Sequence, residues 1–201
     1  MVKKILLWTA AILAVLIIGF LVVVAMQPDD FVITRSATID APPADVFPHV
    51  NDLHQWQAWS PWAKLDPSAK NTFEGPSAGA GAAFSWSGND KIGEGKMTIT
   101  ESKPNELVRM KLEFVRPMED KADTDFVLAP AGGKTDLTWT MAGKNNFMGK
   151  AFCLFMDMDA MVGGDFEEGL ANLKKIVEVE QTTTDKGEKP VSSDEVPVGN
   201  E

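Results

Sequence analysis

The chain has 201 residues, of which 44% are hydrophobic, and a formal net charge of −10, a size that allows one domain with a true core. The excess of acidic side chains argues against a nucleic-acid partner, because polyanion binding needs a basic face. One cysteine excludes an internal disulfide and two histidines leave little for a metal site, so we predict no metal and no cofactor.

An apolar segment near the N-terminus predicts a transmembrane helix. Residues 5–26 contain no charged side chain and follow Lys3 and Lys4. As a helix this segment would measure roughly 33 Å at about 1.5 Å per residue, enough to cross a hydrocarbon core. Because basic residues stay on the cytoplasmic side, we expect residues 1–4 in the cytoplasm and residues 31–201 outside it.

A cleaved signal peptide is the alternative, with a cut between Ala25 and Met26. The apolar run is longer than the about 7–15 residues of a usual signal core, so we favour an uncleaved anchor. Residues 27–30 then form a short linker that holds the following domain close to the bilayer. In either case the domain is exported, and we expect the lone thiol of Cys153 to be buried among its apolar neighbours.

After the linker, the sequence predicts a strand and two short helices. Residues 31–40 alternate between two faces, as in a strand. Residues 41–50 follow a capping residue, Asp40, and combine early prolines with an apolar stripe, which predicts a helix. Residues 53–59 predict a second helical turn, which Pro61 ends.

From about residue 71 the apolar period changes to two, which predicts a series of strands. The candidate strands are 71–74, 81–88, 93–102, 106–116, 122–130 and 134–142. Short turns rich in glycine, proline and asparagine separate them. Consecutive strands joined in this way favour an antiparallel meander.

The predicted strands have one apolar and one polar face, so we expect the sheet to be covered on a single side. The large residues of the apolar face are Phe84, Trp86, Met97, Met110, Leu112, Phe114, Phe126, Trp139 and Met141. Bulky and adaptable side chains under a bent sheet are typical of an apolar ligand cavity. A fully packed core explains the same residues equally well, because core and pocket residues look alike in a sequence.

A long helix is predicted over residues 152–178, because apolar residues recur there at three- and four-residue spacing. It contains Gly163, Gly164 and Gly169, each of which costs about 1 kcal/mol of helix stability. We attribute these glycines to a close approach of the helix to the sheet, with flexibility at a ligand entrance as the alternative. Residues 181–201 have almost no apolar content, so we predict a disordered tail.

One segment carries a resemblance to a known group of proteins. It reads Ala41-Pro42-Pro43-x-x-Val46-Phe47-x-x-Val50-x-Asp52-x-x-x-Trp56-x-x-Trp59-Ser60-Pro61-Trp62. It resembles the opening motif of the SRPBCC superfamily, which includes START-like, polyketide cyclase/dehydrase-type and pollen-allergen-like proteins. The order of the predicted elements over about residues 31–180 is also similar to the helix-grip fold of that group.

The resemblance implies an α+β fold, in which a curved antiparallel sheet of about seven strands wraps around a long C-terminal helix. It is strongest to bacterial members that carry one N-terminal membrane helix, which implies a place at the bacterial cytoplasmic membrane. In that superfamily a tunnel between the sheet and the last helix commonly holds an apolar ligand. The resemblance therefore favours a cavity over a fully packed core.

We accordingly predict a membrane-anchored, extracytoplasmic protein that binds a hydrophobic or amphipathic, lipid-like small molecule. The predicted ligand-binding residues are Trp59, Trp62, Phe84, Trp86, Met97, Met110, Leu112, Phe114, Phe126, Trp139, Met141 and Phe166. Among the tryptophans, we expect Trp56 to anchor the helix pair and Trp59 and Trp62 to lie at the rim of the cavity.

Two other functions stay open. The first is a cyclase/dehydratase-like enzyme, which needs a base inside the cavity and predicts a raised pKa on that acid. The strand acids are Glu74, Glu94 and Asp125, and none is compelling, so no catalytic residue is predicted. The second is a ligand-free interaction module of the cell envelope, which predicts an exposed apolar patch outside the groove.

Two further patterns look like metal sites but are interpreted as structural. His49 and His54 are five residues apart, whereas two ligands on one helical face stand four apart, so we expect surface or capping roles. Four acids match part of a calcium-binding loop, but Met161 and Val162 stand where that loop needs an oxygen ligand and a glycine. These acids are Asp157, Asp159, Asp165 and Glu168.

Overall fold

The computed structural model describes residues 2–185, with side chains to residue 183. Its elements in chain order are α1 (Val2–Ala25), β1 (Asp30–Ile39), α2 (Pro43–Asn51), α3 (Trp56–Trp59), the 3₁₀ helix η1 (Pro61–Lys64), β2 (Lys70–Glu74), β3 (Ala83–Ser87), β4 (Glu94–Lys103), β5 (Leu107–Arg116), β6 (Asp120–Ala131), β7 (Lys134–Lys144), α4 (Phe147–Cys153) and α5 (Met158–Asp185). The predicted strands are all present, with bounds that differ by a few residues.

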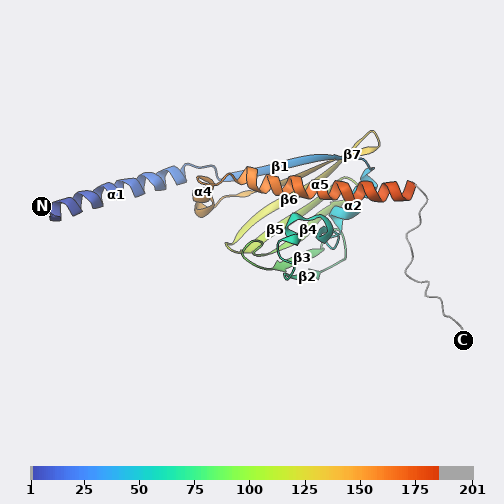
Figure 1. Cartoon of the computed structure of the whole chain (residues 1–201), viewed down its shortest axis with the longest axis horizontal. Coiled ribbons are helices and arrows are strands. Elements are labelled where there is room, and N and C mark those ends of the chain that lie inside the picture. Colours follow the sequence, from blue (N-terminus) through green and yellow to red (C-terminus); the bar gives the residue numbers. More distant parts are fainter. Residues whose placement is uncertain (1, 186–201) are drawn as a thin grey trace, which may run out of the picture.

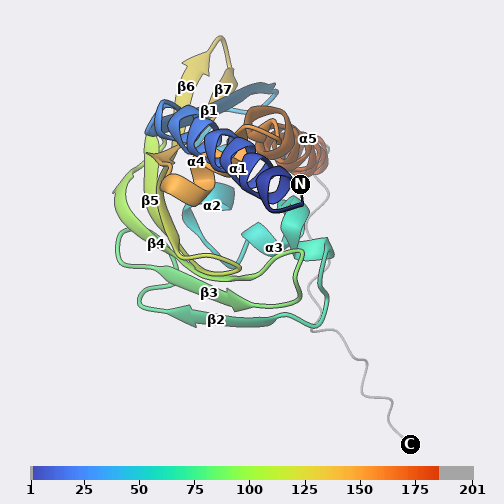
Figure 2. The same cartoon turned by 90° about the vertical axis from the view of Figure 1, so that its left-hand side faces the viewer.

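The strands form one seven-stranded antiparallel sheet in the order β1-β7-β6-β5-β4-β3-β2. The meander of β2 to β7 is confirmed, and β1 extends it by pairing with the last strand. The sheet curves strongly, and α5 runs along its concave side (Figures 1 and 2). The predicted α+β helix-grip fold is therefore confirmed.

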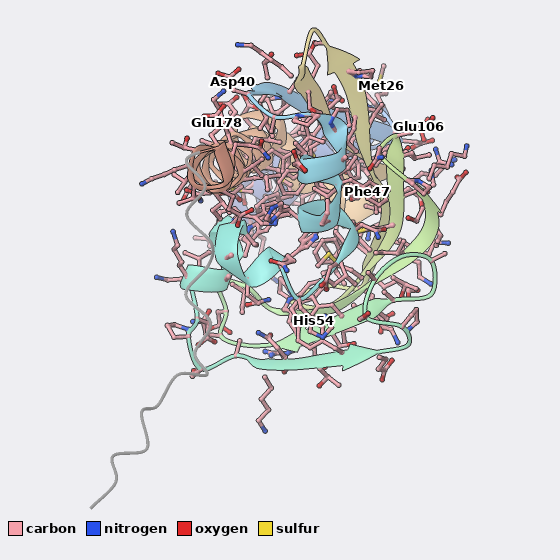
Figure 3. The ribbon with its side chains drawn as sticks, turned by 90° about the vertical axis from the view of Figure 1, so that its right-hand side faces the viewer. Met26, Asp40, Phe47, His54, Glu106 and Glu178 are labelled. Carbon is pink, nitrogen blue, oxygen red and sulfur yellow. The ribbon has the colours of Figure 1, made fainter. Side chains whose placement is uncertain are left out.

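The strand register defines two ends of this sheet. At the end nearer to α1, here the α1 end, Asp30 pairs with Lys144 and Phe114 with Asp120. At the opposite end, here the far end, Ile39 pairs with Thr135. Figure 3 shows the molecule from the far end, where α2 and the start of α3 lie inside the curve of the sheet.

Helix α1 extends away from the sheet, and most of its side chains are exposed (Figure 1). It has a mean hydropathy of 2.9 and is the one helix in the described part of the chain that is long and apolar enough to cross a membrane. A signal sequence at the N-terminus has the same properties. The last turn of α1 contacts the domain, because Val24 is completely buried.

The predicted helix over 152–178 is in fact two helices, α4 and α5, so this expectation was wrong at its start. The side chain of Asn146 accepts a hydrogen bond from the Gly149 backbone and caps α4. Asp157 accepts from the Ala160 backbone and caps α5, so the chain restarts a helix there. Cys153 is exposed rather than buried, since it lies at the end of α4 and not in a core helix.

Helix α5 continues to Asp185, beyond the predicted boundary at residue 180. The remaining part of the predicted tail, residues 186–201, lies outside the described residues.

Two of the three glycines of α5, Gly163 and Gly169, lie where β1 and β7 approach the helix. A Cβ on Gly163 would lie 2.0 Å from the guanidinium of Arg35, which points from β1 to α5 and pairs with Asp159 at 3.0 Å and Glu167 at 2.7 Å. A Cβ on Gly169 would lie 3.0 Å from the ring of Trp139. Close approach therefore explains these two positions.

Close approach does not explain the glycine at position 164, because a Cβ there would meet nothing within 4 Å. We expect Gly164→Ala to raise the free energy of unfolding by about 0.5–1 kcal/mol, through its better helix propensity. Gly163→Ala is the matched control, since its Cβ would displace Arg35 and offset the same gain. Denaturant unfolding of the full chain in detergent measures both, and equal stabilisation by the two variants would contradict the explanation.

Candidate ligand-binding site

Six aromatic side chains fill the middle of the space between the sheet and α5. This aromatic cluster consists of Trp56, Trp59, Trp62, Phe126, Trp139 and Phe166. Trp139 of β7 stacks on Phe166 of α5, with ring centroids 3.9 Å apart and planes within 7°. The ring of Phe126 lies 4.8 Å from that of Trp139. The helix and the sheet therefore meet directly through these rings.

Three of the indole N–H groups hold the short helices in place. Trp56 donates to the carbonyl of Val50 at 3.2 Å, and Trp59 donates to the carbonyl of His49 at 3.0 Å. Both rings are buried, so the expected anchoring position of Trp56 agrees with the structure, whereas Trp59 lies in the core and not at a rim. Trp62 is half-buried and donates to Asp165 at 3.2 Å.

The third buried indole, Trp139, has an unpaired N–H. Its Nε1 is the one fully buried side-chain nitrogen or oxygen within the described residues that has no hydrogen-bond partner. Buried indole N–H groups normally find an acceptor. The opposite edge of the ring, at Cζ3, faces Gly169 of α5, so Nε1 points away from that contact. This N–H is enclosed within the aromatic cluster.

The far half of the concave face is tightly packed. Val108, Met110 and Leu137 are at most 1% exposed there. They lie in one hydrophobic core with Val46 and Val50 of α2, which packs on β6 and β7. Well-packed interiors of this kind have no room for a guest molecule.

The half of the concave face at the α1 end is less completely covered. Trp86, Met97, Leu112 and Phe114, here called the apolar wall, are only half-buried. They are neighbours across β3, β4 and β5, because Met97 pairs with Leu112 and the rings of Trp86 and Phe114 lie 6.2 Å apart. Helix α5 packs mainly on β1, α3 and η1, away from these three strands. Apolar surface is therefore left for a ligand at this end.

The structure thus brings all the predicted ligand-binding residues to the concave side and divides them into two groups. The buried ones are Trp59, Phe84, Met110, Phe126, Trp139, Met141 and Phe166, and the half-buried ones are Trp62 and the four residues of the apolar wall. Two shallow surface grooves, of about 410 and 420 Å³, involve none of these residues. The ligand-binding role of the set stays a prediction.

Asp165 of α5, which the sequence marks only as part of the calcium-like pattern, is a half-buried acid beside the aromatic cluster. Burial raises the pKa of Asp165 above its usual value, the hydrogen bond from Trp62 opposes that shift, and the nearby charge of Glu168 adds to it. The acids considered from the sequence are instead in ion pairs on the outer side of the sheet: Glu74 with Lys96, Glu94 with Arg116, and Asp125 with Arg109. The sequence pattern that includes Asp165 is the calcium-like one, and it gives no sign of this burial, which results from contact with Trp62 of η1.

This shift predicts a pH dependence for Asp165→Asn. A carboxyl whose pKa is raised by folding destabilises the folded state once the pH exceeds its unfolded pKa, and has no such effect when both states are protonated. The gain in stability from Asp165→Asn should therefore grow from about pH 3 towards neutrality and then level off. Melting temperatures of both proteins across this range test it, and a difference that is independent of pH would contradict it.

The two histidines do not form a metal site. His49 is buried, contrary to the surface position expected for it, and lies 3.2 Å from Glu180 of α5. His54 is exposed, hydrogen bonds to Asp52 and stacks on Phe73. Within the described residues no group of three or more His, Cys, Asp or Glu side chains is arranged to hold a metal ion.

The helix-grip fold and the apolar concave face place this protein in the SRPBCC superfamily. Comparison with known proteins supports this assignment. Residues 30–178 match the family described as polyketide cyclase/dehydrase and lipid transport, and the chain belongs to this family. Among curated proteins none matches.

Solved structures with the same fold are distant in sequence. Protein MLL2253 from Mesorhizobium loti is 16% identical with a TM-score of 0.54, over 74% of this chain and 97% of that one. Protein CV1439 from Chromobacterium violaceum is 18% identical with a TM-score of 0.52, over 73% and 96%. The Aha1 dimer from Colwellia psychrerythraea is 18% identical with a TM-score of 0.54, over 74% and 97%. At such identities the likeness shows the fold alone.

Proposed function

We propose that this protein is a membrane-anchored, extracytoplasmic binding protein for a hydrophobic or amphipathic small molecule of lipid-like character. The family supports a hydrophobic ligand-binding fold. The single observation that carries the proposal is the apolar wall, whose four side chains stay half-buried while the far half of the same face is closed. Exposed apolar surface on a concave face favours binding of an apolar guest.

The anchor is α1, and its orientation follows from its flanking charges. Lys3 and Lys4 precede the apolar run, so they stay in the cytoplasm and the domain lies on the other side. Half-buried Trp62 and Asp165 provide polar atoms at the edge of the aromatic cluster, where the polar end of an amphipathic ligand could bind. A lipid-like molecule combines such an atom with a long apolar part.

A cyclase/dehydratase-like enzyme is the second candidate function, and one observation favours it. Asp165 is half-buried at the edge of the aromatic cluster and its pKa is raised, as a catalytic acid or base requires. Asp165→Asn separates the two functions: it abolishes turnover in an enzyme and leaves ligand binding intact in a binding protein.

Photocrosslinking tests the proposed function on the full chain in proteoliposomes. A fatty acid that carries a diazirine in its chain is incorporated, irradiated, and mapped to residues by peptide mass spectrometry. We expect crosslinks in the apolar wall, on β3, β4 and β5, in addition to those in α1. Crosslinks confined to α1 would overturn the proposal.

A further inference from the structure

The segment between β7 and α5 has an unusually apolar surface. Six large side chains of this segment and of the first turn of α5 are exposed, between 43% and 76%, and are here called the α4 surface: Phe147, Met148, Phe152, Phe155, Met156 and Met161. They fall within a stretch of fifteen residues, 147–161. Soluble surfaces rarely concentrate apolar side chains in this way unless they meet a partner or a membrane.

Contacts with the end of α1 determine where the α4 surface lies. The ring of Phe155 is 6.2 Å from that of Phe20 in α1, and α4 is the element that packs against α1. Figures 1 and 2 both show α4 beside the last turns of α1, at the α1 end of the sheet. The α4 surface is therefore continuous with the apolar surface of α1.

Polar contacts hold α4 in this position. Lys150 forms an ion pair with Asp29, which lowers the pKa of Asp29, and the side chain of Lys150 is only 12% exposed. The backbone N–H of Asn145 donates to the carbonyl of Asp29 at 2.6 Å. The one charged side chain of α4 is thus turned towards the linker, and the apolar side chains are left on the outside.

The depth of α1 in a bilayer fixes the depth of the α4 surface. Phe20 lies five residues before the end of α1, which corresponds to about 7.5 Å along the helix axis. A residue that touches Phe20 therefore lies at the boundary between head groups and acyl chains when α1 spans the membrane. Segments that bind lipid interfaces bury their apolar face by about 5–10 Å, which is the same depth.

We propose that the α4 surface inserts into the lipid interface around α1 and holds the α1 end of the domain, with its apolar wall, against the bilayer. This inference rests on the proposed membrane anchor. A bilayer fits better than a protein partner, because the surface is continuous with α1 and its side chains are phenylalanine and methionine. The exposed acids of the same stretch, Asp157 and Asp159, follow α4. A lipid leaving the membrane then enters the concave face without crossing water.

The native cysteine provides the test. Cys153 is the chain's only cysteine, lies at the end of α4 and is exposed, so the full chain can be labelled there with the fluorophore NBD. The control is the double variant Cys153→Ser/Glu106→Cys, labelled at the far end of the sheet, where Figure 3 shows Glu106. Both are reconstituted into phosphatidylcholine vesicles, with or without lipids that carry a doxyl spin label near the head group.

The two labelled positions should respond in opposite ways. We expect doxyl lipids to quench the label at position 153 at least about threefold more than at position 106, and aqueous iodide to show the reverse preference. Phe155→Glu should shift the label at position 153 towards the aqueous response. Strong iodide quenching at position 153, equal to that at position 106 and without doxyl quenching, would overturn the inference.

Extraction of the vesicles with alkaline carbonate separates this inference from the proposed anchor. If the protein stays with the lipid and the label at position 153 is aqueous, only the role of the α4 surface is wrong. If carbonate removes the protein, α1 does not span the bilayer, and both proposals fail.

Discussion

Replacement of Trp59 by alanine is expected to lower the free energy of unfolding by roughly 3–5 kcal/mol, as large-to-small changes of buried aromatic residues do. Trp59 is completely buried, and its ring lies 4.7 Å from that of Trp56 and 5.6 Å from that of Trp139. Its removal also leaves the His49 carbonyl without the donor at 3.0 Å. Urea unfolding of the full chain in detergent, followed by near-ultraviolet circular dichroism, measures the loss.

Trp86→Ala is the matched control for Trp59→Ala. The same residue type is removed, but from the half-buried apolar wall, where less surface is lost from the interior. We expect a cost of roughly 1–2 kcal/mol. Equal costs at the two positions would show that both are packed alike, and the distinction between the closed aromatic cluster and the open apolar wall would be wrong.

Introduction of a charge into the apolar wall should abolish most ligand binding. Leu112 is half-buried and pairs with Met97 across β4 and β5. In Leu112→Glu, an apolar ligand would have to desolvate the new carboxylate, which is unfavourable without a partner. We expect the yield of diazirine crosslinks in the wall to fall about tenfold or more, corresponding to about 1.4 kcal/mol of lost affinity. Crosslinks in α1 should be unchanged.

Val115→Glu is the control on the same strand. Val115 lies on the opposite face of β5 and is 50% exposed, so a carboxylate there stays in water and the crosslinking yield should not change. Leu112→Trp provides a second, uncharged variant that reduces binding by filling space instead. Folding of each variant is checked by circular dichroism, and unchanged crosslinking in both Leu112 variants would exclude the wall as the binding site.

The strands and their faces were the most predictable part of this molecule. Alternation placed Met110 and Leu112 on one face and Arg109 on the other, and the structure agrees, since Arg109 is exposed and pairs with Asp125. A period of two determines the face of every residue once the strand is recognised. The apolar face could therefore be predicted without knowledge of what covers it.

The region between β7 and α5 was predicted poorly. Phe152 and Phe155 have the spacing of a core helix, yet they lie on the exposed α4 surface beside α1. A membrane-facing or partner-facing surface has the same residue types as a core, so local pattern cannot separate them. The acids from Asp157 onward fit the start of a helix, but the sequence does not show that Asp157 caps a second helix and not the long one predicted from residue 152.

The order of the elements, the apolar side of the sheet and the apolar character of α1 follow from local sequence, because each depends on residues close together in the chain. How far α5 and the short helices cover that side depends on contacts between distant parts of the chain. Trp59 and Trp86 illustrate the difference: both are tryptophans of the predicted site, and only the first is fully enclosed. Such burial requires contacts between residues that are distant in sequence, as between Trp139 and Phe166. No local sequence pattern specifies how close two such residues come in space.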